Sequence, residues 1–286
     1  MNGIIVVNKD LGYTSRDIVN IVGKSLGTRK VGHTGTLDPM ASGVLVICVG
    51  KALKVCEMLT NHDKEYIAGV TLGIETDTLD MEGNVLSTEN VDMDKDLIVE
   101  VVNSFLGVYN QEVPKYSAVK VNGKKLYEYA RNNINVKLPS RDVEIKSIEI
   151  IDNIIYDNGK IHFKIKCTVS KGTYIRSLVR DIGNKLGTVA VMNSLVRTRQ
   201  GEFTLDEAYS IDDIKNRNIK FIDIMDAFPN IDRINVSDDI AFKIRNGVVM
   251  EKFFDNDLAF ILDNNNSLIA IYKNDENKSR AYKMFV

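Results

Sequence analysis

The chain has 286 residues, of which 44% are apolar and 27% charged, and its formal net charge at pH 7 is -2. These values are ordinary for a soluble globular protein with a substantial core, and the sequence contains no internal repeat or low-complexity tract. The apolar runs are too short to cross a bilayer, and the first residues do not resemble a signal peptide. We therefore expect a cytoplasmic protein that does not span a membrane.

The charges are unevenly distributed along the chain. Residues 164–201 contain eight basic residues and one acid, residues 112–147 contain eight basic and four acidic residues, and residues 75–100 contain nine acids and one lysine. Such segments can form a basic face that binds backbone phosphates, although charges scattered over a solvated surface fit the sequence equally well.

The first elements in chain order are a short buried strand over residues 3–9, which ends in Lys9, and an amphipathic helix. Thr14 or Ser15 can cap this helix and Gly27 can end it. A glycine-rich loop follows, in which His33 and Asp38 are the ionisable residues. An apolar run over residues 44–49 then predicts a buried strand.

Asp38 is the first candidate functional residue. Because Pro39 follows it, its backbone is expected to be extended or turned, and the buried strand behind it would hold the carboxylate rigidly. A catalytic acid suits this position, but so does an ordinary Asp in a solvated turn. The three histidines and three cysteines lack the spacing of metal ligands, so we expect no metal site and buried, reduced thiols.

The middle of the chain predicts further regular elements. These are a helix through Ala52 and Leu59, a strand over 66–72, an acidic loop over 73–83, a helix over 94–106, two strands flanking the hairpin turn DNGK, and a helix over 174–186. Between them, residues 107–142 contain KYSAVKVNGKKLYEYAR, whose mixed basic residues and tyrosines suit contact with RNA or a partly helical surface excursion. After Pro229, short strands and Asn/Asp/Gly turns predict a small, mostly β unit.

The segment GHTGTLDPMASGVLVICVGKALK resembles the catalytic segment of bacterial tRNA pseudouridine synthases of the TruB type, which carry their catalytic Asp in a GHxGxLDPxAxG context. The resemblance covers most of the chain. Lys9, Gly12 and Thr14-Ser15 match the first motif of the family, although Asp10 stands where the family usually has Pro. DKEY matches the segment that supplies an aromatic residue, here Tyr66, and SKGTYIRSLVRDIGNKLG matches the motif that supplies Tyr174 and Arg176.

The resemblance implies an α+β fold of the pseudouridine synthase type, with a mixed, largely antiparallel sheet, flanking helices and a central cleft. Residues 1–232 would form the catalytic domain, with an RNA-contacting thumb loop at about 107–142. Residues 233–286 would form a small, mostly β domain that weakly resembles a PUA-type RNA-binding domain.

The implied activity is the isomerisation of uridine to pseudouridine at position 55, in the T arm of tRNA. The C1'–N1 bond breaks, the uracil turns, and C5 joins C1'. Because this chemistry involves no net redox change or hydrolysis, it requires no cofactor, metal or nucleoside triphosphate. The expected partner is tRNA; no obligate protein partner is implied, and a monomer is expected.

The resemblance also implies a role for each site residue. Asp38, as nucleophile or base, Tyr66 and Arg176 would be catalytic, with Arg176 keeping Asp38 ionised and Tyr66 stacking on a uracil flipped out of its RNA stack. Substrate binding would involve the remaining candidates, namely Lys9, His33, Tyr174, Leu195, Lys124, Lys125 and Arg131. On the sequence alone, His33 fits a structural loop residue nearly as well, and each tyrosine taken singly fits core packing.

Two other classes stay open. A non-catalytic RNA-binding protein would keep the basic segments without needing Asp38 and Arg176 together. A glycoside hydrolase or nucleosidase would need a second carboxylate facing Asp38, and the sequence does not mark one.

Overall fold

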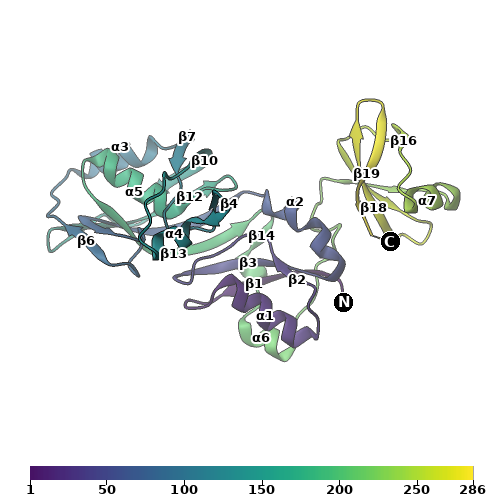
Figure 1. Cartoon of the computed structure of the whole chain (residues 1–286), viewed down its shortest axis with the longest axis horizontal. Coiled ribbons are helices and arrows are strands. Elements are labelled where there is room, and N and C mark those ends of the chain that lie inside the picture. Colours follow the sequence, from purple (N-terminus) through teal and green to yellow (C-terminus); the bar gives the residue numbers. More distant parts are fainter. Residues whose placement is uncertain (286) are drawn as a thin grey trace.

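The computed structural model describes residues 1–285. The strands of its larger sheet all come from residues 3–204 (Figure 1). Along this sheet the strands follow the order β1 (Gly3–Lys9), β3 (Ala41–Val49), β13 (Ala190–Gln200), β4 (Lys64–Leu72), β12 (Lys160–Val169), β10 (Ser140–Ile150) and β7 (Gly107–Glu112). The short strands β2 (Val31–His33), β11 (Ile155–Asp157) and β14 (Phe203–Thr204) pair at its sides.

Neighbouring strands in this sheet are antiparallel except at one junction. β3 and β13 run parallel over three residue pairs, in which Ala41 lies opposite Leu195 and Gly43 opposite Arg197. This short parallel junction joins the N-terminal part of the sheet to the part that contains β4. It also places the loop that precedes β3 beside the middle of β13. The expected mixed, largely antiparallel sheet is confirmed.

Helices cover one face of the sheet as two pairs, α1 (Ser15–Leu26) with α6 (Ile211–Asn216) and α3 (Lys95–Asn103) with α5 (Ile175–Leu186). The sequence explains the ends of α1, because Thr14 and Asp17 form a capping box and Gly27 adopts φ 65° at the other end. The apolar faces of the helices and the alternating apolar residues of the strands form one buried core.

The predicted hairpin around DNGK is present between β11 and β12. Asn158 and Gly159 adopt φ values of 50° and 71°, which are the left-handed angles that a two-residue turn of this kind requires. The predicted helix through Ala52 and Leu59 is a 3-10 helix, η1 (Gly50–Val55), followed by the short helix α2 (Cys56–Thr60). The acidic loop begins with β5 (Ile74–Thr76), which pairs with β6 (Val85–Thr88) just after the loop.

Residues 107–112 form β7, which pairs with β10 at the edge of the sheet. The sequence did not predict this strand because its residues lack a clear apolar alternation; Gln111 is fully buried through polar contacts. The remaining excursion, residues 113–139, holds β8 (Lys120–Val121), β9 (Lys124–Lys125) and α4 (Leu126–Arg131).

A second sheet forms the small, mostly β C-terminal domain (Figure 1). Its strand order is β15 (Asp232–Asn235), β17 (Leu258–Leu262), β18 (Leu268–Asp275), β19 (Lys278–Met284) and β16 (Met250–Glu251), and it carries α7 (Asp238–Arg245). The segment between the sheets includes the 3-10 helix η2 (Leu205–Glu207). No helix in residues 1–285 is long and apolar enough to cross a bilayer.

An apolar cluster joins the C-terminal domain to the larger sheet. It contains Phe228, Phe260 and Phe285 together with Val44 and Val46, which lie on the face of β3 opposite α1. The larger sheet is therefore covered on both faces near β3, by α1 on one side and by this cluster on the other.

Candidate active site

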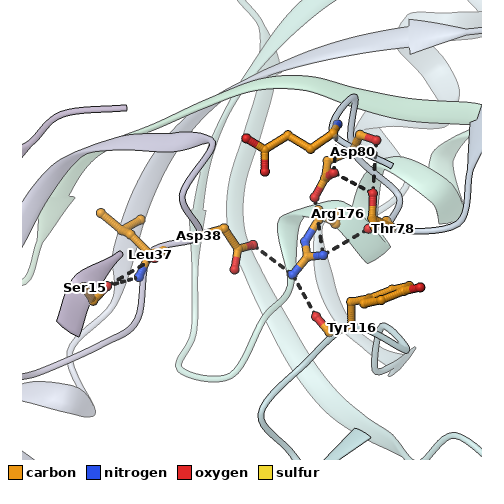
Figure 2. A network of polar contacts seen from close by, with 8 residues as sticks. Ser15, Leu37, Asp38, Thr78, Asp80, Tyr116 and Arg176 are labelled. Atoms are coloured by element: carbon orange, nitrogen blue, oxygen red, sulfur yellow. Dashed lines mark hydrogen bonds and ion pairs between the residues drawn. The ribbon is translucent and has the colours of Figure 1, made fainter. Parts of the chain in front are cut away.

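Asp38 lies in the loop 34–40 between β2 and β3, and neighbouring elements fix the backbone on both sides of it. The Ser15 hydroxyl, at the start of α1, donates to the Leu37 carbonyl at 3.1 Å and accepts from the Leu37 amide at 2.8 Å (Figure 2). On the other side, the Gly12 amide donates to the Pro39 carbonyl at 2.9 Å. The matches around Gly12 and Ser15 therefore mark residues that hold the loop.

Lys9, a predicted substrate-binding residue, lies buried beneath the same loop. Its Nζ donates to the carbonyls of Asp10, Tyr13 and Pro39 at 3.0, 2.7 and 3.5 Å. Burial lowers the pKa of Lys9 to about 8, although the negative charge of Asp38 opposes this shift. These contacts place the ammonium where it stabilises the backbone next to Asp38.

Arg197 holds the other end of the loop. Its side chain is 1% exposed, and its Nε and Nη2 donate to the carbonyls of Val44 and Gly35 at 2.6 and 3.1 Å. The sequence placed Arg197 in a basic segment for which phosphate binding and scattered solvated charge were equally good interpretations. The structure shows instead that its guanidinium is enclosed. Nothing in the sequence separates this arginine from Arg199 two residues later, which is only half-buried.

The Asp38 carboxylate faces Arg176, which the sequence predicted as its partner. Asp38 Oδ2 lies 2.8 Å from Arg176 Nη2, and the Asp38 side chain is 36% exposed whereas that of Arg176 is 7% exposed. Arg176 belongs to the first turn of α5, and Figure 2 shows its guanidinium between Asp38 and the acidic loop. The ion pair therefore orients the carboxylate from one side and leaves part of it accessible.

A second carboxylate, Asp80, contacts the same guanidinium. Asp80 Oδ2 lies 3.4 Å from Arg176 Nη1 and is almost fully buried, and Thr78 Oγ1 donates to Asp80 Oδ1 at 2.6 Å (Figure 2). Asp80 was not among the site residues predicted from the sequence. Its only signal was a position in the acidic loop, among four acidic residues that composition alone does not distinguish.

Two backbone carbonyls complete the surroundings of Arg176. Nη1 donates to the Thr78 carbonyl at 3.0 Å, and Nη2 donates to the Tyr116 carbonyl at 3.1 Å. The guanidinium therefore links the loop that carries Asp38, the acidic loop, and the excursion 113–139. Three segments that are far apart in the sequence meet at one cation.

Tyr66 and Leu195 lie in the core on adjacent strands. Leu195 is opposite Ala41 of β3 and Ala68 of β4, and both it and Tyr66 belong to the same buried cluster as Leu37. Tyr66 is 8% exposed, and its hydroxyl makes no hydrogen bond to another residue within 1–285. This location is next to the loop of Asp38, on the face of the sheet that the helices cover.

His33 is half-buried at the end of β2. Burial, together with the positive charges of Arg197 and Arg16, lowers the pKa of His33, so the imidazole is neutral at pH 7. Its Nδ1 accepts a hydrogen bond from the Gly35 amide at 3.3 Å. The remaining ring nitrogen is the group that a substrate could contact.

Other predicted residues lie apart from the Asp38–Arg176 pair. Tyr174 caps α5, its backbone amide and carbonyl bond to the Gln111 side chain, and its ring lies 5.5 Å from the Arg141 guanidinium carbon. Lys125 and Arg131 both lie over the ring of Tyr127, at 5.4 Å each, and Lys124 is exposed. These cations belong to the excursion and do not touch the ion pair.

Comparison with known proteins identifies the family of the chain. A family model described as TruB family pseudouridylate synthase, N-terminal domain, matches residues 24–175, and one described as tRNA pseudouridylate synthase B C-terminal domain matches residues 176–224. The chain is 45% identical over 258 residues to the tRNA pseudouridine synthase B of Bacillus licheniformis, covering 87% of this chain and 84% of that protein.

The similarity extends over the full length of other relatives. The tRNA pseudouridine synthase B of Clostridium perfringens is 41% identical over 100% of this chain and 99% of its own. Among solved structures, a chain from a Cbf5-Nop10-Gar1 complex has a TM-score of 0.70 at 26% identity, covering 99% of this chain and 84% of that one. The chain therefore belongs to the TruB family of tRNA pseudouridine synthases, enzymes that isomerise uridine to pseudouridine.

Proposed function

We propose that this enzyme modifies the uridine at position 55, in the T arm of tRNA, and that Asp38 acts on the sugar of that nucleotide. The observation that carries the proposal is the Asp38–Arg176 ion pair of 2.8 Å, in which the carboxylate is partly exposed and the guanidinium is buried. Both candidate roles of the carboxylate need its negative charge, and in this geometry the positive charge of Arg176 lies beside it.

The reaction exchanges two bonds within one nucleotide. The C1'–N1 bond breaks and the C5–C1' bond forms, N1 gains a proton and C5 loses one, so the product has the same composition as the substrate. Asp38 either attacks the sugar as a nucleophile or removes a sugar proton as a base. Arg176 is a positioning residue in either case, because it holds the carboxylate and is itself held by Asp80 and the Thr78 carbonyl.

The base must leave its stack to reach Asp38. Tyr66 provides an aromatic ring for the flipped uracil, Leu195 provides an apolar wall beside it, and the neutral His33 braces the nucleotide. Lys9 acts indirectly, through the backbone of the loop that bears Asp38. Tyr174 contributes through the position of α5, whose first turn carries Arg176.

The remaining parts of the chain bind the RNA around this nucleotide. The catalytic domain spans residues 1–232, and its thumb loop, within about 107–142, contacts the T arm through Lys124, Lys125 and Arg131. The C-terminal domain, residues 233–286, is a PUA-like domain that accompanies the catalytic domain in a monomeric enzyme.

The test is modification mapping of an unmodified tRNA transcript with the purified protein and with the Asp38→Asn variant. The parent is expected to convert the uridine at position 55, and the variant to lose turnover by at least about 1000-fold while still binding tRNA, because Asn keeps the size but removes the charge. Near-normal turnover by the verified variant would reject Asp38 as the catalytic group. Conversion at another position would reject the assigned target.

A further inference from the structure

The basic residues of segment 164–201 are mostly engaged within the protein. Lys166 and Arg199 lie near Glu65, Arg180 pairs with Glu112 and Asp181, and Arg197 is enclosed. Neutralised or buried cations release few counterions when RNA binds and therefore add little affinity. The densest basic segment of the sequence is thus not the best RNA-binding surface of the folded chain.

A different set of cations is exposed and unpaired. Arg16, Asn20 and Lys24 recur every four residues on α1, and Arg29 follows the helix; we call these four residues the α1 stripe. They line one shallow groove, which continues to Val31 at the start of β2 and contains no acidic side chain. Within residues 1–285, none of its three cations forms an ion pair with a carboxylate.

The α1 stripe begins next to the candidate active site. Ser15, which precedes Arg16, is hydrogen-bonded to Leu37, the neighbour of Asp38. Burial lowers the pKa of His33, which precedes the loop, and the charges of Arg197 and Arg16 add to this shift. Arg16 and Lys24 are eight residues apart on a helix that rises 1.5 Å per residue, so the stripe extends about 12 Å away from Asp38 before it reaches Arg29.

We propose that the α1 stripe binds the backbone phosphates of the RNA strand that runs from the modified loop into its stem. This inference rests on the proposed function, since it assumes that the modified nucleotide lies at Asp38. A row of three unpaired cations with a hydrogen-bonding amide between them matches a line of successive phosphates. The contacts are to the backbone, so they position the stem and do not read its sequence.

The test compares two triple variants that remove the same number of charges. The first is Arg16→Gln with Lys24→Gln and Arg29→Gln. The control is Lys95→Gln with Lys164→Gln and Lys185→Gln, three exposed lysines on α3, β12 and α5. Affinities for a T-arm hairpin with its full stem, and for one with a shortened stem, are measured across a salt titration, and thermal melting checks that each variant folds.

With the full stem, the stripe variant is expected to bind at least about tenfold more weakly than the parent at 0.1 M salt, with a salt slope smaller by about 2 to 3. The control should stay within about twofold, and the loss should shrink with the shortened stem. An unchanged affinity and slope, or an equal loss in the control, would overturn the proposal and leave the stripe as ordinary surface or a contact for an acidic protein.

A second measurement covers the case in which the stripe variant does not fold. Asn20, in the middle of the stripe, is replaced by p-benzoylphenylalanine. This variant is irradiated in the presence of the hairpin, and the position of the crosslink on the RNA is mapped by primer extension. A crosslink in the stem supports the proposal. The proposal is refuted if crosslinking from position 20 does not exceed the level seen when Lys164 carries the same replacement. If the parent itself converts no tRNA uridine, the proposed function fails, which is distinct from failure of the stripe alone.

Discussion

The charged residues around Asp38 differ in how their charges are balanced. Arg176 contacts two carboxylates, whereas Lys9 and Arg197, among residues 1–285, form no ion pair and donate to backbone carbonyls. A carbonyl contact does not neutralise the cation; it fixes the chain that bears the carbonyl. The two buried cations therefore hold the loop, and Arg176 holds the carboxylate.

Lys9 should reveal its burial in the pH dependence of stability. Its pKa is about 8 in the folded protein and 10.5 in the unfolded chain, so between these values the unfolded chain holds more protons and stability rises with pH. Stability gained in this way is lost as the pH falls through about 8. We expect the free energy of unfolding of the parent, relative to Lys9→Met, to increase by about 1–2 kcal/mol from pH 8 to pH 10.

Urea denaturation of both proteins at several pH values measures this difference, in which the other titrating groups cancel. If the free energies of unfolding of the two proteins change in parallel with pH, Lys9 keeps an ordinary pKa and its ammonium is solvated.

Tyr66 allows stacking to be separated from proton transfer. Because its hydroxyl makes no hydrogen bond within residues 1–285, Tyr66→Phe should preserve folding and tRNA binding. If the oxygen takes part in removing the C5 proton, turnover should fall by at least about tenfold, and a C5-deuterated substrate should show a larger isotope effect than with the parent. Tyr66→Leu should also weaken binding. Normal turnover by Tyr66→Phe with an unchanged isotope effect would leave Tyr66 as a stacking platform only.

At the scale of elements, the parallel junction between β3 and β13 leaves no room for a side chain at Gly43. A Cβ there would lie 2.2 Å from the Arg197 carbonyl oxygen, and the residue has φ 104°. Gly43→Ala must therefore push β3 away from β13 and shift the loop of Asp38. We expect it to lower the free energy of unfolding by more than about 3 kcal/mol and to reduce turnover strongly.

Gly27→Ala is the matched control for this prediction. Gly27 also has a positive φ, of 65°, but no atom lies within 4 Å of its added Cβ, so only backbone strain of about 1 kcal/mol remains. Urea denaturation and single-turnover assays compare the two variants. Equal losses in both would show that the backbone angle, and not the close approach of β13, restricts position 43.

Local patterns predicted the elements whose signals lie within a few residues. The capping box of Thr14, the left-handed turn at Asn158 and Gly159, and the alternating residues of β12 are of this kind. β7 was not predicted because its residues do not alternate between apolar and polar. This edge strand is held by its pairing with β10, and its buried residue Gln111 is polar. The burial of Asp80 and Arg197 could not be predicted, because the residues that enclose them come from distant segments of the chain.

At the scale of the whole molecule, Phe285 anchors the C-terminal domain to the larger sheet. The Phe285 side chain is 2% exposed in the apolar cluster behind β3, Lys51 Nζ donates to its carbonyl at 2.5 Å, and Lys54 lies over its ring. Phe285→Ala should cost about 3 kcal/mol and release the domain, which makes the segment near Pro229 sensitive to protease.

Limited proteolysis and urea denaturation measure these effects, with Phe242→Ala as the control because Phe242 is 70% exposed. A parent-like digestion pattern for Phe285→Ala would show that the remaining aromatic contacts suffice to hold the two domains together.

The junction between β3 and β13 also sets an order in time. Asp38 and Gly43 leave the ribosome early, whereas Arg197, the partner of Gly43, is added 154 residues later. At about 5–20 residues per second, synthesis of the intervening chain takes about 8–30 s. During that interval Arg176 and β13 are still being made, so the nascent chain carries Asp38 without the residues that position its carboxylate. We therefore expect pseudouridine formation to begin only after the synthesis of β13, the strand that joins the two parts of the sheet.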